Sequence, residues 1–177
     1  INITNLGSDI LFLRLIMNST SIKALAIRTV KLESAAIAQL ENSINADFVK
    51  ATELINACKG RLVISGIGKS AVIAQKIVAT FNSTGTPAIF MHAADAIHGD
   101  LGMIQQEDVV IIISKSGESP EIKVLVPLIR NFGNILIGMV GSTKSYLAKN
   151  STIILNTTVE QEACPNNLAA TSSTTAQ

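Results

Sequence analysis

The chain reads VVIII at residues 109–113 and SKSGES at residues 114–119. Five consecutive branched apolar residues predict a strand that is buried on both faces. Ser119, Pro120 and Glu121 then predict the start of a helix, because serine is a good N-cap, proline is tolerated at the first helical position and an acid suits the first turn. A strand that passes through a short polar turn into a helix is the repeating unit of an α/β fold.

The same alternation recurs through most of the chain. Short apolar runs predict strands at residues 61–65, 88–91, 109–113, 135–140 and 152–155. Helical spacing of apolar residues predicts helices at residues 20–40, 46–57, 69–82, 119–131 and 143–149, with a partial helical turn at 95–102. We therefore expect a three-layer α/β/α sandwich with a five-stranded parallel sheet, of the Rossmann-like or flavodoxin-like kind.

Length and composition suit one domain. The chain has 177 residues, of which 47% are hydrophobic and 15% charged, so a substantial core can be buried. A net charge of +1 gives no case for a nucleic-acid or anionic-membrane partner, and no apolar run reaches the length of a membrane span. Cys58 and Cys164 have no metal-ligand spacing, which favours inert thiols in a reducing cytoplasm over a disulfide.

We expect a flexible leader over residues 1–19 and a single domain over residues 20–177. The Ser/Thr cluster at residues 171–175 has the composition of a helix start, so we also expect further chain beyond Gln177.

The turn at residues 114–119 predicts a phosphate site. Ligands of parallel α/β sheets bind at the carboxyl ends of the strands, and the N–H groups of a first helical turn attract anions. The hydroxyls of Ser114, Ser116 and Ser119 can add hydrogen bonds to phosphate oxygens. A well-capped turn without a ligand is the alternative.

A second glycine-containing turn, GIGKSA, occupies residues 66–71. A Walker P-loop is excluded, because Val63 stands where that motif needs glycine. The spacing fits a dinucleotide fingerprint, but the acid that should hold the ribose is missing near residues 91–93. We favour a sugar-phosphate site that includes Gly66 and Lys69, and leave dinucleotide binding and a ligand-free turn open.

Three further groups of polar residues could carry chemistry. The stretch 92–103 contains two histidines and two aspartates without a zinc spacing, and His98 is a candidate for acid–base work or for capping a backbone carbonyl. Glu162 is a candidate general base, with a solvated acidic turn as the alternative. A second set of hydroxyls at a predicted helix start is formed by Thr171, Ser172, Ser173 and Thr174.

Taken together, these motifs resemble the sugar isomerase (SIS) domain over residues 20–176. Within it, the chain is similar to the arabinose 5-phosphate isomerase family at GIGKS (66–70), STGTP (83–87), HGDLGM (98–103), SGES (116–119) and EACP (162–165). The resemblance implies an aldose–ketose isomerase that interconverts ribulose 5-phosphate and arabinose 5-phosphate through a cis-enediol, for Kdo and lipopolysaccharide synthesis. It also implies a cytoplasmic homo-tetramer whose active sites draw on neighbouring subunits, with no cofactor and no metal.

By the same resemblance, Lys69, Glu121 and Glu162 match catalytic positions. The serine turn at 114–119 and the hydroxyl run at 171–174 match phosphate-binding elements. We expect Glu162 to be the base, Glu121 a second carboxylate, Lys69 a stabiliser of the enediolate and His98 a group for ring opening. A sugar-phosphate sensor without catalysis, as in SIS-containing transcriptional regulators, is the alternative, although residues 1–60 show no basic recognition helix.

The chain departs from the family pattern at identifiable positions. Lys115 stands where the family usually has asparagine, and Ala71-Val72 stand where it usually has Gly-His. The family also carries a further histidine in a Ser-His-Pro segment beyond the late hydroxyl run, and often paired regulatory modules of the cystathionine β-synthase type.

Overall fold

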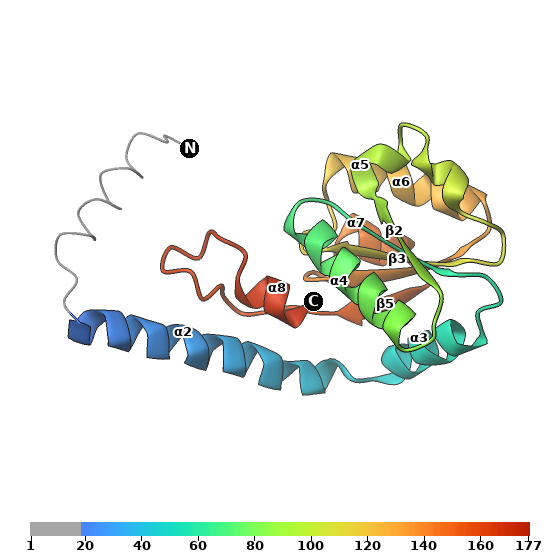
Figure 1. Ribbon diagram of the computed structural model, residues 1–177. Coiled ribbons are helices and arrows are strands. Elements are labelled where there is room, and N and C mark those ends of the chain that lie inside the picture. The colour runs from blue at the N-terminus through green and yellow to red at the C-terminus, as the bar shows by residue number, and fades with distance from the viewer. Residues whose placement is uncertain (1–18) are drawn as a thin grey trace.

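The computed structural model describes residues 19–177, and a five-stranded parallel sheet forms its centre (Figure 1). The strand order is β2-β1-β3-β4-β5. The strands are β1 (Leu62–Gly66), β2 (Ala88–His92), β3 (Val109–Ser114), β4 (Ile135–Val140) and β5 (Ile153–Asn156). The predicted sheet and its five strands are therefore confirmed. Residues 1–18 of the predicted leader lie outside the described residues.

The helices also follow the apolar spacing of the sequence. They are α2 (Ser19–Gln39), α3 (Ala46–Ala57), α4 (Lys69–Ser83), α5 (Ala93–Ala96), α6 (Pro120–Asn131), α7 (Tyr146–Asn150) and α8 (Ser172–Ala176), with 3-10 turns at Leu40–Ser43 and Asp100–Met103. The helix predicted from residue 143 begins later, because Ser145 is its N-cap and accepts a hydrogen bond from the Ala148 N–H (3.2 Å).

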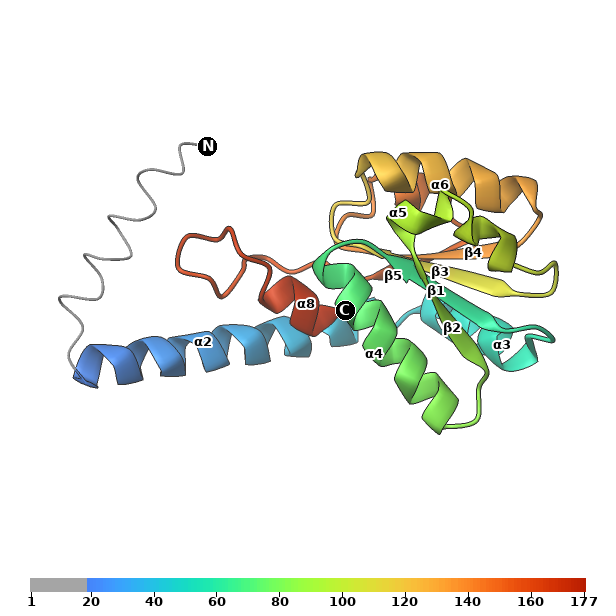
Figure 2. The same ribbon diagram turned by 45° about the horizontal axis from the view of Figure 1, so that its top comes forward.

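Helices cover both faces of the sheet, as expected for parallel strands. Figure 2 shows α3 and α4 on one face and α5 and α6 on the other. The α6 face is the more completely buried: Ile122, Leu125, Val126 and Ile129 have no exposed surface. Burying one such side chain contributes about 1.5–3 kcal/mol, so this layer fixes the position at which α6 begins.

The topology places two turns side by side. The chain leaves β1 toward β2 on one side and returns through β3 toward β4 and β5 on the other, so the order reverses between β1 and β3. Gly66, the last residue of β1, is in register with Ile113 of β3. The turns that follow these two strands therefore flank the crevice where ligands of open α/β sheets bind.

The long helix α2 extends away from the sheet, with α8 beside it (Figures 1 and 2). Hydrogen bonds connect α8 to α2 and α4. The Ser172 hydroxyl donates to Glu33 Oε1 of α2 (3.4 Å), and the Ser70 hydroxyl of α4 donates to Oε1 of Gln177, the residue after α8 (3.2 Å). Much of the apolar surface of α2 is exposed, at Ile22, Leu25, Ile27, Val30 and Ile37. Among the helices of residues 19–177, none has the length and apolar character that a bilayer crossing requires.

Candidate phosphate and carboxylate site

The turn between β3 and α6 is held by its own serine hydroxyls. The Gly117 N–H donates to Ser114 Oγ (3.0 Å), and the Glu118 N–H donates to Ser116 Oγ (3.3 Å). A hydroxyl that accepts these bonds still carries a hydrogen that it can donate to an anion. Gly117 has a φ of +63°, and a Cβ there would collide with the Ser145 side chain. The turn therefore requires glycine at this position.

Contacts with the β4–α7 loop and with the first residues of α7 make the turn rigid. The Gly141 N–H donates to the Lys115 carbonyl (3.0 Å), and the Leu147 N–H donates to the Gly117 carbonyl (3.0 Å). The Tyr146 N–H donates to Glu118 Oε1 (2.6 Å). Donors fixed in this way need little rearrangement when a ligand binds.

Three buried hydroxyls at this edge of the sheet, those of Ser65, Ser119 and Ser173, have no hydrogen-bond partner among the described residues. Ser119 occupies the predicted N-cap position of α6, but its hydroxyl makes no capping bond. Ser65 lies in β1, directly before Gly66, and is fully buried. Because buried polar groups are normally paired, the orphan hydroxyls point to an acceptor that a ligand would supply.

Glu162 lies in the segment between β5 and α8 and its side chain is 1% exposed. Its Oε2 accepts hydrogen bonds from the Thr171 N–H (2.7 Å), the Thr171 hydroxyl (3.1 Å) and the Ser173 N–H (3.1 Å). Its Oε1 accepts from the Lys115 ammonium. Burial alone would raise the pKa of Glu162, but the hydrogen bonds from Lys115, Ser173 and Thr171 outweigh it and lower this pKa to about 2.

The late hydroxyl run is mostly committed to the protein itself. Thr171 donates its hydroxyl to Glu162, Ser172 to Glu33, and Thr174 to the Thr171 carbonyl (2.7 Å). The backbone donors at the start of α8 also bind the Glu162 carboxylate, which thus takes the place that an external anion would occupy. The serine turn thus keeps more of its donors free for an external anion, and phosphate binding by either segment stays a prediction.

The other predicted site residues follow the carboxyl ends of three different strands, and among the described residues no hydrogen bond or ion pair joins their side chains to one another. Lys69 is the exposed first residue of α4, Glu121 is half-buried in the first turn of α6, and His98 is exposed beyond β2. Within residues 19–177, no hydrogen bond or ion pair joins any of these three side chains to Glu162. Their catalytic roles stay predictions.

The sequence alone missed the pairing of Lys115 with Glu162. The departure from the family at Lys115 is visible in the sequence, but 47 residues separate it from the acid that it contacts. In the described part of the chain, no three His, Cys, Asp or Glu residues gather as metal ligands would.

The SIS domain model matches residues 54–177. Arabinose 5-phosphate isomerase KdsD of Pseudomonas aeruginosa is 53% identical over 150 residues, covering 85% of this chain and 46% of its own length. KdsD of Yersinia pestis is 48% identical over 149 residues, covering 84% of this chain and 45% of its own length. The chain thus spans less than half of each of these curated relatives.

A solved structure from E. coli CFT073, described as a complex with arabinose 5-phosphate, superposes with a TM-score of 0.86 at 39% identity, covering 90% of this chain and 85% of that one. The family match over residues 54–177 and the similarity to this solved structure confirm the family that the motifs predicted. This chain belongs to the SIS domain family.

Proposed function

We propose that this chain is the isomerase domain of an arabinose 5-phosphate isomerase, which interconverts D-ribulose 5-phosphate and D-arabinose 5-phosphate for Kdo and lipopolysaccharide synthesis. The observation that carries the proposal is the rigid serine turn at the β1–β3 crevice, with the orphan hydroxyls of Ser119 and Ser65 beside it. The names of the relatives and the sugar-phosphate complex of the structural neighbour support this substrate.

The phosphate end of the sugar provides the anchor. It accepts hydrogen bonds from Ser114, Ser116 and Ser119 and from the first N–H groups of α6, a helix of 12 residues. Binding energy from this remote group fixes the reacting carbons against the catalytic side chains.

The chemistry moves one proton between adjacent carbons. A base removes the proton beside the carbonyl, and the released electron pair forms the C=C bond of a cis-enediol while the C=O electrons move onto the carbonyl oxygen, which takes up a proton. The hydroxyl on the neighbouring carbon then loses its proton and becomes the new carbonyl, and the base returns its proton to the former carbonyl carbon. We assign the base to Glu162, a second carboxylate to Glu121, stabilisation of the developing oxyanion to Lys69 and ring opening to His98. The reaction as written needs no cofactor.

We also propose a cytoplasmic homo-tetramer. The exposed apolar side chains along α2 offer a surface that a second copy can cover, and large exposed apolar patches mark interaction sites. Cys58 and Cys164 are free thiols, which suits a reducing compartment.

A coupled assay with D-ribulose 5-phosphate tests the proposal. We expect the protein to form arabinose 5-phosphate, and we expect Glu162→Gln to lose at least about a hundredfold in kcat, the usual scale for a general base, while still binding substrate. Glu160→Gln, at an exposed acid two residues away, is the matched control and should keep its activity. Binding of pentose phosphate without turnover by the unaltered protein would instead indicate a sensor.

A further inference from the structure

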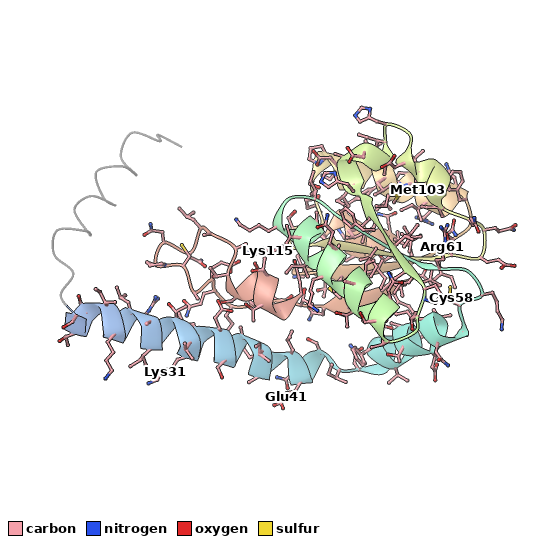
Figure 3. All side chains as sticks on the ribbon, viewed as in Figure 1. Lys31, Glu41, Cys58, Arg61, Met103 and Lys115 are labelled. Carbon is pink, nitrogen blue, oxygen red and sulfur yellow. The ribbon has the colours of Figure 1, made fainter. Side chains whose placement is uncertain are left out.

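Lys115 connects the two anion-binding parts of this edge. It lies inside the serine turn, between Ser114 and Ser116, and its ammonium pairs with Glu162 in the segment that precedes α8. Figure 3 shows Lys115 at the end of the sheet that faces this segment. The lysine side chain is 50% exposed and the glutamate side chain 1% exposed, so the lysine is the mobile partner of the pair.

The neighbouring charges of the turn are already engaged. Lys123 Nζ pairs with Glu118 Oε2 (2.8 Å), and the other oxygen of Glu118 accepts from the Tyr146 N–H. Lys115 is therefore the cation of the turn that can change partner without breaking the contacts that hold the turn in shape.

The pair raises a chemical difficulty for the assigned base. A carboxylate that accepts four hydrogen bonds and has a pKa of about 2 is a weak base near neutral pH, where the best general bases have a pKa close to the working pH. Losing the bond from Lys115 would leave Oε1 without its cation and would make the carboxylate more basic.

We propose that Lys115 is a positioning residue that exchanges anions: it holds Glu162 in the unliganded protein and transfers to the phosphate group when a sugar phosphate binds in the serine turn. This inference rests on the proposed function, because the incoming anion is the phosphate of the substrate. Binding then frees Glu162 Oε1 at the moment when substrate is present. The backbone bonds to Oε2 keep the carboxylate in place.

The competition between two anions for one cation is tested by binding inorganic phosphate, which requires no turnover. Titration calorimetry would compare the unaltered protein, Lys115→Met, Glu162→Gln and the double variant. We expect Lys115→Met to bind phosphate about tenfold more weakly, since a hydrogen bond to a charged group is lost. We expect Glu162→Gln to bind about tenfold more tightly, because the competing carboxylate is gone.

The double variant distinguishes exchange from a fixed electric field. If Lys115 changes partner, the gain from Glu162→Gln largely disappears in the Lys115→Met background. If Glu162→Gln tightens phosphate binding equally in both backgrounds, the carboxylate acts only through its electric field and the lysine does not change partner. That result would overturn the inference. Weaker phosphate binding by Glu162→Gln would overturn it as well.

Hydrogen exchange provides a second readout if Glu162→Gln does not fold. In the unaltered protein, saturating phosphate should speed exchange of amides in residues 157–170, because the tether to the turn is released. Unchanged or slower exchange with phosphate bound would contradict the inference. If the phosphate titrations and the hydrogen exchange give the expected results but ribulose 5-phosphate is not turned over, the isomerase proposal is rejected while the exchange of Lys115 between anions stands.

Discussion

The two edges of the sheet each carry a buried carboxylate paired with a cation, but they differ in what surrounds the pair. At the amino edge, Asp108 accepts from the Arg61 N–H (2.7 Å), the Arg61 guanidinium (3.1 Å) and the Gln105 N–H (2.9 Å). The guanidinium also donates to the Met103 carbonyl (2.7 Å). Figure 3 labels Arg61 and Met103 at the end of the sheet away from Lys115.

This difference fits the proposed function, in which the amino edge is structural and the carboxyl edge is functional. At the amino edge the Arg61 guanidinium is held between the Asp108 carboxylate and the Met103 carbonyl. At the carboxyl edge a half-exposed lysine holds the carboxylate, and hydroxyls such as those of Ser119 and Ser65 lack partners within the described chain. Both carboxylates are ionised, but among the described residues the carboxyl edge has unpaired hydroxyls that can donate to an anion, whereas the unpaired group at the amino edge, the Asn134 amide oxygen, can only accept.

The largest expected effect tests the structural edge. Asp108→Ala leaves the Arg61 and Gln105 donors without an acceptor, and we expect a loss of about 3 kcal/mol in the free energy of unfolding. Urea unfolding measures this loss. Glu107→Ala, at the exposed neighbour, should change stability by less than about 0.5 kcal/mol. A fall in kcat at temperatures where Asp108→Ala remains folded would break the separation of the two edges.

At the functional edge we expect a smaller effect, on substrate binding and not on stability. Ser119→Ala removes a hydroxyl that has no partner within the described chain, so stability should change by less than about 0.5 kcal/mol. The KM for ribulose 5-phosphate should rise about tenfold, because a hydrogen bond to the phosphate is lost. Ser142→Ala, in the neighbouring exposed loop, is the control. A large stability loss with an unchanged KM would show that Ser119 is structural.

The smallest effect concerns acid stability. The folded pKa of Glu162, about 2, lies below its ordinary value of 4.5, so its stabilisation is complete above about pH 4.5 and is lost as the pH falls toward 2. At about pH 4 the expected loss is below about 1 kcal/mol. Urea unfolding from about pH 7 to about pH 3 measures it, and Glu162→Gln should show a shallower acid dependence. Parallel curves for the two proteins would contradict the assigned contacts of Glu162.

The sequence predicted the fold better than it predicted the contacts of the site. The five strands can be identified from the sequence, because a strand that is buried on both faces is a continuous run of apolar residues. The serine turn is equally local, since its hydroxyls bond to amides two or three residues away. The pairing of Glu162 is not local: Glu162 meets Lys115 and the start of α8 only after the whole sheet has formed.

The late hydroxyl run shows the same limit from another direction. Serine and threonine at a helix start have one composition whether they bind an external anion or the protein's own carboxylate. Thr171 is the example, because its amide and hydroxyl both donate to Glu162. Only the folded chain decides which anion fills the place.

The tight packing at Gly66 limits how this crevice can be redesigned. A Cβ at Gly66 would lie 2.9 Å from the backbone of Ser70, whereas one at Gly102 would meet nothing within 4 Å. Any side chain at residue 66 would push the start of α4 away from the strand. Substitutions that aim to reshape this crevice should therefore leave residue 66 unchanged.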